Sequence, residues 1–267
     1  MLEQMIEIVR NAGEILRGAQ NITRDVREKT SHLDLVTAYD LQVQEQLRRD
    51  LLALLPEAGF FGEEDESHDI EGKTAVFIVD PIDGTTNFIR NLHHSCISVG
   101  LQVDGKMEYA VVFNPYYDEM FSARRGKGAF LNGARIFAAN RPMRESLLLF
   151  GSAIYYRESL PATVRLVQEL LPRTLDFRRG GSAALDLCYI AAGWGDVLFE
   201  CCLSPWDYAA GSLIASEAGA VVTALDGSPL RFHEKCSIAA GGAQAHSELC
   251  ELARRIKNEP GMERTIR

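Results

Sequence analysis

The stretch Phe77–Phe88, FIVDPIDGTTNF, joins a run of apolar residues to two closely spaced aspartates. The apolar run predicts a buried strand that ends at Asp80. Pro81 fixes one backbone angle and removes a hydrogen-bond donor, so the chain turns there and lets Asp80 and Asp83 converge on one point. Because two carboxylates a few ångströms apart repel each other unless a cation lies between them, the turn predicts a metal site.

The oxygen ligands of this turn favour Mg²⁺, and the residues after Asp83 favour a phosphate bound beside it. Hard oxygen ligands suit Mg²⁺ better than Zn²⁺, and the carbonyl of Ile82 is within reach of the same ion. Gly84 lets the backbone approach a ligand closely, and a helix that starts near Thr85 would direct free N–H groups at a phosphate. The alternative interpretation is a strand and a turn whose aspartates only cap a helix, which the doubled aspartate around proline disfavours.

Two further acidic segments are weaker signals on their own. Glu63 and Glu64 follow an apolar segment, but a glutamate pair in a loop is usually solvated. Asp207 lies behind Pro205 in the expected first turn of a helix, where an acidic residue also interacts favourably with the helix dipole. Neither segment predicts a function without the others.

Composition and charge limit the classes of partner. The chain has 267 residues, 46% of them hydrophobic, which suits one large domain or two intimate halves. A formal charge of −9 makes nucleic acid and anionic membranes unfavoured partners. No apolar run approaches the roughly 20 residues of a membrane span, and the N-terminal segment has glutamates inside its apolar pattern, unlike a signal peptide. We therefore expect a cytoplasmic protein without a membrane partner.

The cysteines and histidines offer no metal site. The six cysteines lie mostly within apolar runs and none forms a CxxC pair, so we expect buried thiols rather than disulfides or zinc ligands. His93 and His94 are adjacent, and neighbouring residues on a strand point to opposite sides, so at most one would face the site. We interpret both as rim or core residues.

The hydrophobic pattern predicts a mixed α/β (α+β) fold. An amphipathic helix is expected over 2–18, and a second from about Thr37 to Leu55, with Thr37 as N-cap and Asp40 completing a capping box. Short β-type runs separated by turn signals predict an antiparallel meander over 95–133. The remainder alternates, with helices expected at 161–171, 181–193, 206–219 and from about 244, and strands at 196–201, 220–227 and 236–242.

Together these segments resemble the inositol monophosphatase family. The resemblance covers nearly the whole chain and is carried by GEE (62–64), DPIDGTTNF (80–88) and WDYAAGSLIASEAGA (206–220), with support from 29–40, 178–193 and 196–200. It implies a five-layer αβαβα sandwich in a single domain over 1–267, with subregions at about 1–150 and 151–267. It also implies a homodimer and a Mg²⁺-dependent, Li⁺-sensitive phosphomonoesterase.

The resemblance implies roles for individual residues. The ligands of two to three Mg²⁺ ions would be Glu63, Asp80, the Ile82 carbonyl, Asp83 and Asp207. The catalytic residues would be Asp40 and Thr85, which orient the attacking water, and Glu63, which helps to hold a third ion. The contacts to the substrate would be made by the Gly84 and Thr85 amides and by Lys29, Ser182, Ala183 and Glu200.

The substrate is left open among several small phosphate esters. Glu200 beside the alcohol part favours a polyol, because a carboxylate accepts hydrogen bonds from hydroxyls. Inositol 1-phosphate is our first choice, ahead of fructose 1,6-bisphosphate or another sugar phosphate and histidinol phosphate. Some relatives act in transcription and RNA processing, so a binding module that retains the fold is a further alternative. The basic clusters at 124–127 and 178–179 are small, which argues mildly against RNA.

Overall fold

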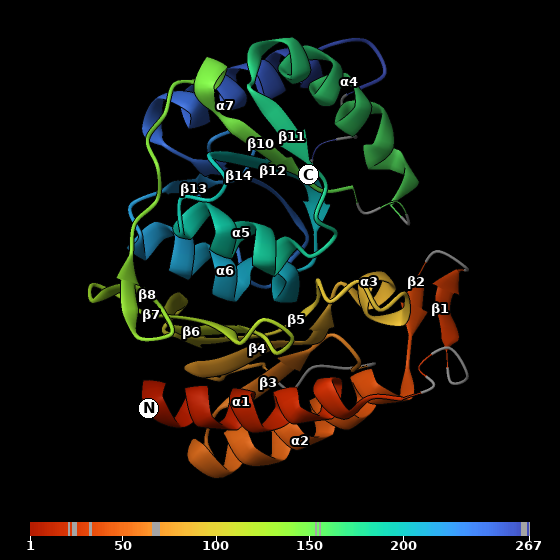
Figure 1. Ribbon diagram of the computed structural model, residues 1–267, viewed down its shortest axis with the longest axis vertical. Helices are drawn as coiled ribbons and strands as arrows, with labels where there is room; N and C mark the ends of the chain where they lie inside the picture. Colours follow the sequence, from red (N-terminus) through yellow and green to blue (C-terminus); the bar gives the residue numbers. More distant parts are fainter. Residues whose placement is uncertain are drawn as a thin grey trace.

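Helices and sheets alternate in five layers (Figure 1). The computed structural model describes residues 1–20, 22, 26–31, 34–65, 70–152, 154, 156–262 and 266, without the side chains of 28–31, 34 and 35. Helices α1 and α2 form one outer layer, and α4 and α7 form the other; α5 and α6 lie between the two sheets. The predicted five-layer αβαβα sandwich is therefore confirmed. The helices are α1 (Leu2–Gly18), α2 (Ala38–Leu54), α3 (Thr85–Ile89), α4 (Leu160–Leu170), α5 (Ala183–Ala191), α6 (Pro205–Glu217) and α7 (Ala243–Lys257).

The first sheet carries the predicted meander. Its strand order is β3-β4-β5-β6-β7-β8-β9, with β3 parallel to β4 and every later pair antiparallel. Strand β3 was not predicted, because its four residues include two glycines, and β9 lies beyond residue 133, where the predicted meander ended. The strands are β3 (Gly59–Gly62), β4 (Ala75–Asp83), β5 (Cys96–Val103), β6 (Lys106–Asn114), β7 (Glu119–Arg124), β8 (Gly128–Leu131) and β9 (Ala134–Ile136).

The second sheet mixes parallel and antiparallel pairs in the order β11-β10-β12-β14-β13. The pairs β10–β11 and β10–β12 are parallel, and β14 is antiparallel to both β12 and β13. Strands β10 and β11 were not predicted, because runs of four and three residues are too short to show a periodicity. The strands are β10 (Leu147–Phe150), β11 (Asp176–Arg178), β12 (Val197–Leu203), β13 (Val221–Thr223) and β14 (Cys236–Gly241).

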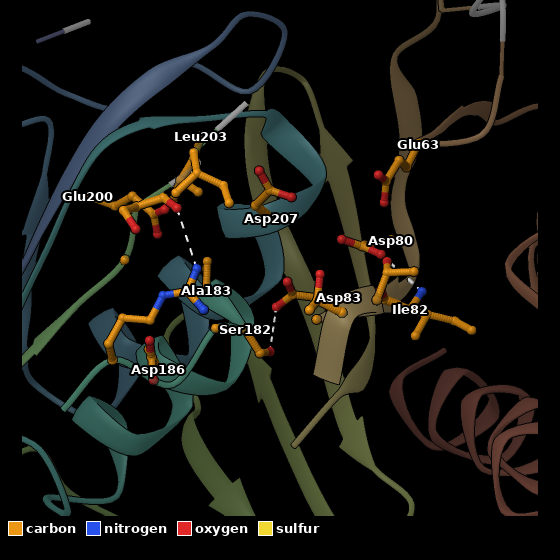
Figure 2. A pocket seen from close by; sticks show the side chains of 18 residues that line it. Glu63, Asp80, Ile82, Asp83, Ser182, Ala183, Asp186, Glu200, Leu203 and Asp207 are labelled. Atoms are coloured by element: carbon orange, nitrogen blue, oxygen red, sulfur yellow. Dashed lines mark hydrogen bonds between the residues drawn. The ribbon is translucent and has the colours of Figure 1, made fainter. Parts of the chain in front are cut away.

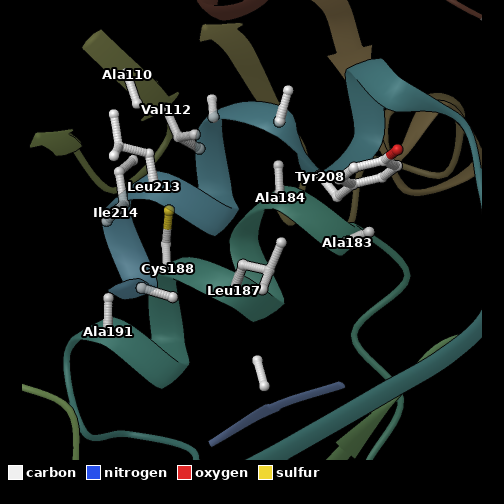
Figure 3. Packing of buried hydrophobic residues seen from close by; sticks show 14 of the residues in the cluster. Ala110, Val112, Ala183, Ala184, Leu187, Cys188, Ala191, Tyr208, Leu213 and Ile214 are labelled. Carbon is white, nitrogen blue, oxygen red and sulfur yellow. The ribbon is translucent and has the colours of Figure 1, made fainter. Parts of the chain in front are cut away.

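The sheets are joined by a core that both of them share. One buried cluster includes Val112 of the first sheet and Ile238 of the second, with α5 and α6 between them (Figure 3). The two helices approach closely, because a Cβ at Gly211 would lie 2.8 Å from the Cβ of Leu187. Two outer clusters pack α1 and α2 on the first sheet and α4 and α7 on the second. The single domain remains a prediction that the shared core favours.

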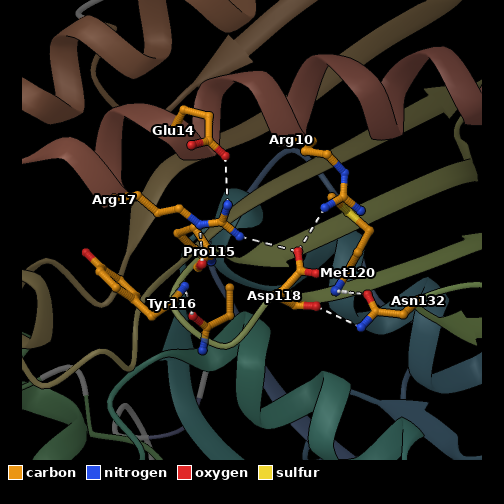
Figure 4. A network of polar contacts seen from close by, with 9 residues as sticks. Arg10, Glu14, Arg17, Pro115, Tyr116, Asp118, Met120 and Asn132 are labelled. Atoms are coloured by element: carbon orange, nitrogen blue, oxygen red, sulfur yellow. Dashed lines mark hydrogen bonds and ion pairs between the residues drawn. The ribbon is translucent and has the colours of Figure 1, made fainter.

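Helix α1 is held on the first sheet by packing more than by charge. A Cβ at Gly13 would lie 2.6 Å from the ring of Phe113, so the helix approaches the sheet closely. Figure 4 shows Arg10 and Arg17 reaching Asp118, at 2.8 and 3.3 Å. These ion pairs are exposed, and exposed pairs contribute at most about 1 kcal/mol each.

The remaining local predictions can be read from the same structure. Thr37 caps α2 and Asp40 completes the capping box, as predicted. All six cysteines are buried free thiols, which is also confirmed. No helix in the described ranges is long and apolar enough to cross a membrane. The short elements are β1 (Arg27–Ser31), β2 (Asp34–Val36) and 3-10 turns at Met143–Glu145, Arg157–Ser159 and Leu171–Arg173.

Candidate active site

A pocket of about 390 Å³ lies where β4 and α3 of the first half meet α5, α6 and β12 of the second (Figure 2). Its lining comes from segments far apart in the sequence. Acidic side chains dominate it, and those that line it are Glu63, Asp80, Asp83, Asp186, Glu200 and Asp207. The pocket therefore concentrates negative charge in a recess of the protein.

Three of these carboxylates form a compact cluster. One oxygen each from Asp80, Asp83 and Asp207 lies within 4.8 Å of the others, and all three residues are buried. Figure 2 shows the carboxylate of Glu63 beside that of Asp80, facing the same space. The structure thus brings together the four acidic residues that the sequence picked out from three separate motifs.

The bend that carries Asp80 and Asp83 is an irregularity within β4. The pairing of β4 with β5 shifts register between these two residues and resumes where Asp83 faces Cys96. The prediction that the strand ends at Asp80 is therefore wrong, because β-pairing continues beyond Pro81 after a bulge, a position that tolerates proline. The Ile82 N–H donates to Asp80 Oδ1 at 3.0 Å, and the Thr85 hydroxyl donates to the Ile82 carbonyl at 3.1 Å.

Asp83 is bound by the start of α5, which sequence reasoning missed. Its Oδ2 accepts the Ser182 hydroxyl at 2.6 Å and the Ala184 N–H at 2.7 Å. Burial raises the pKa of Asp83 to about 6, although these hydrogen bonds act in the opposite direction. The same Ser182 hydroxyl accepts from Leu185 N, so one side chain caps α5 and orients an acidic residue of β4.

Asp207 is held in the first turn of α6 while it faces the pocket. Its Oδ2 accepts the Ser204 N–H at 2.7 Å in a capping box. The two interpretations of Asp207, a helix-capping residue and a member of an acidic site, are therefore compatible, because the same residue completes the capping box and belongs to the carboxylate cluster. Pro205 fits the start of the helix, where no N–H partner is needed.

The crowding of carboxylates raises pKa values within the cluster. Burial, followed by repulsion from Glu63 and from Asp83, raises the pKa of Asp80 well above its usual range. Burial and then repulsion from Asp83 and Glu63 do the same to the pKa of Asp207. A divalent cation would remove this repulsion, and carboxylate and carbonyl oxygens are the ligands that Mg²⁺ prefers. The residues therefore fit a magnesium site.

The backbone at the start of α3 has the predicted form. Helix α3 begins at Thr85, and Gly84 precedes it with a φ of 89°, a conformation that L side chains rarely adopt. A Cβ at Gly84 would also lie 3.0 Å from the carbonyl oxygen of His94. Gly84 and Thr85 both line the pocket. Glycine is thus required here for the turn and for the close approach of the next segment.

Some of the remaining predicted site residues line the pocket, and others do not. Ser182, Ala183 and Glu200 line the pocket, so the structure brings them to the acidic cluster. Asp40 lies at the start of α2, where its Oδ2 accepts the N–H and the hydroxyl of Thr37 at 2.8 and 2.6 Å. Its pairing with Thr85 stays a prediction. The side chain of Lys29 lies outside the described residues.

Neither His93 nor His94 is among the residues that line the pocket. They precede β5 rather than lying on it, so the argument from strand alternation does not apply to them. His93 stacks on Tyr116 with ring centroids 4.7 Å apart. His94 is half-buried, and the loss of solvent around its ring lowers its pKa. Sequence reasoning also missed two residues that do line the pocket, Arg179 and Asp186, since neither belongs to an acidic motif or a turn signal.

Known proteins share both the sequence pattern and the fold. The model of the inositol monophosphatase family matches residues 1–258. The "Nus factor SuhB" of Pseudomonas aeruginosa is 36% identical over 257 residues, covering 93% of this chain and 94% of the relative. The crystal structure of the extragenic suppressor protein suhB from Bartonella henselae aligns with a TM-score of 0.87 and 32% identity, over 95% of this chain and 98% of that one. An inositol monophosphatase from Anabaena aligns with a TM-score of 0.83 and 30% identity, over 95% of each chain.

The five-layer fold and the buried acidic pocket thus agree with the matches along the sequence. The chain belongs to the inositol monophosphatase family.

Proposed function

We propose that the protein is a Mg²⁺-dependent phosphatase that hydrolyses the phosphate monoester of a small polyol, with inositol 1-phosphate as the first candidate. The observation that carries the proposal is the convergence of Asp80, Asp83 and Asp207 on one buried point beside the start of α3. Glu63 and the Ile82 carbonyl complete the proposed ligand set for two to three ions. A cluster of this kind has no structural use that outweighs its repulsion, so a cation-dependent function explains it best.

We assign a different role in hydrolysis to each group of residues around the pocket. When bound, Mg²⁺ would supply the positive charge that lowers the pKa of a water and stabilises the departing alcohol oxygen. The Gly84 and Thr85 amides would hold the oxygens of the phosphate, which gain negative charge during transfer. Thr85 would orient the attacking water while Asp40 accepts a proton. Glu200 and the backbone around Ala183 would bind the alcohol hydroxyls.

A phosphate-release panel tests the proposal. Purified protein with Mg²⁺ should release phosphate from inositol 1-phosphate faster than from fructose 1,6-bisphosphate, histidinol phosphate or 3′-phosphoadenosine 5′-phosphate. The variant Asp80→Asn should lose at least about a thousandfold in kcat, because one of the proposed magnesium ligands is removed, and Glu64→Gln serves as the matched acidic control. Absence of release from every ester would overturn the proposal.

The same proposal includes a homodimer and inhibition by Li⁺. Sedimentation should give about twice the mass of 29.6 kDa calculated for the chain. Li⁺ at millimolar concentration should lower the steady-state rate. A monomer, or a rate unchanged by Li⁺, would count against these two parts without touching the hydrolysis itself.

A second candidate is a role in transcription, favoured by the similarity to proteins named Nus factor SuhB. In that case the chain would act as a binding module whose phosphatase site matters less. The variant Asp83→Asn separates the two functions. If a strain with this variant keeps the cellular role while hydrolysis is lost, the binding function is the physiological one.

A further inference from the structure

The side chain of Gln44 reaches from α2 to the segment that carries Glu63. Gln44 is only 5% exposed, and both ends of its amide form hydrogen bonds. Its Oε1 accepts the N–H of Glu64 at 3.0 Å, and its Nε2 donates to Asp65 Oδ1 at 3.0 Å. Both of these residues follow Glu63 directly in the chain. The amide therefore fixes the backbone on the carboxyl side of a residue that lines the acidic pocket.

The segment of Glu63 is fixed on its other side by β4. The Glu63 N–H donates to the Val79 carbonyl at 3.1 Å, next to the register pair of Gly62 with Val79. A Cβ at Gly62 would lie 2.5 Å from Gln44 Oε1, so a larger residue there would displace the amide. The backbone at Glu63 is thus held from β4 on one side and from α2 on the other.

Arg48, one turn further along α2, holds the carboxylate that Gln44 binds. The Arg48 guanidinium forms an ion pair with the same Oδ1 of Asp65. It also lies over the ring of Phe60, with its Cζ 4.1 Å from the ring centroid. Phe60 is a buried residue of β3. The position of Asp65 is therefore set by two residues of α2 rather than by one.

One face of α2 is directed at two parts of the site. Asp40 and Gln44 are four residues apart, so their side chains lie on the same face of the helix, and both are buried. Asp40 is the proton acceptor of the proposed hydrolysis, and Gln44 holds the segment of Glu63. Because a helix keeps a fixed distance between its residues, α2 sets the backbone of Glu63 relative to Asp40.

A glutamate next to a loop binds a metal ion more tightly when its backbone is already ordered, because less conformational entropy is lost on binding. We propose that Gln44 is a positioning residue, which prepares Glu63 to bind Mg²⁺ through its bonds to Glu64 and Asp65. This inference rests on the proposed function, in which Glu63 is a ligand of Mg²⁺. Loss of the Gln44 bonds should weaken Mg²⁺ binding and leave the reaction at saturating Mg²⁺ almost unchanged.

The variant Gln44→Glu tests the inference by replacing a donor with an acceptor. The new carboxylate can still accept the Glu64 N–H, but it lies against the carboxylate of Asp65 and repels it. Calorimetric titration of EDTA-treated protein should give a Kd for Mg²⁺ that is raised about tenfold, and half-maximal phosphate release should need about tenfold more Mg²⁺. At saturating Mg²⁺, kcat and KM should stay within about twofold of the wild type.

Exchanging the donor and the acceptor should rescue the variant. In the double variant Gln44→Glu with Asp65→Asn, the amide at position 65 can donate to the carboxylate at position 44. The Kd for Mg²⁺ should then return to within about threefold of the wild type. Gln42→Glu is the matched control, since it makes the same chemical change two residues away at an exposed position of α2. Gln44→Met, which forms neither bond, should also raise the Kd and replaces Gln44→Glu if that variant does not fold.

A lower Tm with unchanged Mg²⁺ affinity in Gln44→Glu and Gln44→Met would overturn the inference, because Gln44 would then only stabilise the fold. An equal loss of affinity in the single and the double variant would refute it as well, because Gln44 would then not act through Asp65. If no ester is hydrolysed by the wild type, the proposed function is wrong, and calorimetry alone decides on Gln44. A raised Kd in Gln44→Glu that the double variant restores would still support its positioning role.

Discussion

Asp83 depends on residues about 100 positions away for its orientation and its charge. Its Oδ2 is bound by the Ser182 hydroxyl and the Ala184 N–H, both at the start of α5. These donors favour the ionised carboxylate, while burial opposes it and keeps the pKa at about 6. The orientation and the pKa of Asp83, which the sequence placed in a turn, therefore depend on the second half of the chain.

Replacing Ser182 by alanine should raise the pKa of Asp83 further, because a hydrogen bond to the ionised form is lost. Mg²⁺ affinity, which needs the ionised carboxylate, should then weaken and should require a higher pH to recover. The helix cap is lost too, which costs about 1 kcal/mol of stability. Calorimetric titration with Mg²⁺ from pH 5 to 8 measures the shift, and Ser182→Thr, which keeps the hydroxyl, is the control. An unchanged pH dependence in Ser182→Ala would contradict the expectation.

The acidic cluster should make the metal-free protein less stable at high pH. Raised carboxylate pKa values mean that the native state binds protons more tightly than the unfolded chain, so stability falls as pH rises from about 4. For Asp83 this fall ends near pH 6, and for Asp80 and Asp207 it continues to higher pH. Mg²⁺ should reverse the trend, since it binds the ionised cluster only in the folded state.

The variant Asp207→Asn tests this effect, because asparagine keeps an acceptor for the Ser204 N–H and removes one charge. In EDTA at pH 8 its Tm should exceed that of the wild type, and the difference should shrink toward pH 4. Saturating Mg²⁺ should raise the Tm of the wild type but not that of the variant. Thermal unfolding at several pH values is the measurement, and a variant less stable than the wild type at pH 8 would contradict the argument.

At the scale of elements, helix starts place the polar groups of the site. Helix α3 presents Gly84 and Thr85, α5 binds Asp83, and α6 carries Asp207 in its first turn. Free N–H groups gather at such helix ends, so each of them favours a neighbouring negative charge. Helix α2 contributes Asp40 in the same way, although Asp40 does not belong to the described lining of the pocket.

Variants of the two residues in the capping box of α2 can distinguish a structural role of Asp40 from a catalytic one. Thr37→Ala should cost about 1 kcal/mol of stability by removing the cap, with kcat within about twofold of the wild type. Asp40→Asn should cost a similar amount and also lower kcat at least about a hundredfold, because Thr85 would lose its proton acceptor. Denaturant unfolding and kcat are compared for both variants. If the two lose activity equally, Asp40 acts only through the helix.

At the scale of the whole molecule, the pocket connects the two halves. Glu63, Asp80 and Asp83 come from the first sheet and its loops, whereas Glu200 and Asp207 come from β12 and α6. The shared core of α5 and α6 fixes the distance between these groups. A cation in the cluster would therefore add a connection across the middle layer.

Hydrogen exchange tests this connection. Mg²⁺ should slow exchange at 62–65, 80–89 and 203–209 together, because one bound cluster restrains all three segments. In Asp207→Asn the protection should be lost in all three segments, including the two that lack the substitution. Exchange at α1, which lies on the far side of the first sheet, is the internal reference. Protection confined to 80–89 would mean that the cation does not bridge the halves.

Much of the fold could be predicted because it is encoded locally. Apolar periodicity gave α1, α2 and the meander, and the Thr37 and Asp40 pair gave the helix start, since such patterns need only neighbouring residues. Strands β3, β10 and β11 could not be predicted, because they are three or four residues long and form only by pairing with other strands: β3 with β4, β10 with β12, and β11 with β10. The acidic residues were recognisable by their motifs, yet Arg179 and Asp186 had no such signal.

The sequence by itself determined the chemistry of this protein: which side chains are acidic, where glycine permits the turn before α3, and which segments match the inositol monophosphatase family. Only the tertiary structure decided that Asp83 is held by α5, that Glu63 shares one recess with the three clustered carboxylates, and that Arg179 lies on the wall with Glu200. The physical reason is that local patterns encode helices, strands and turns, whereas distances between remote side chains follow from how the layers pack.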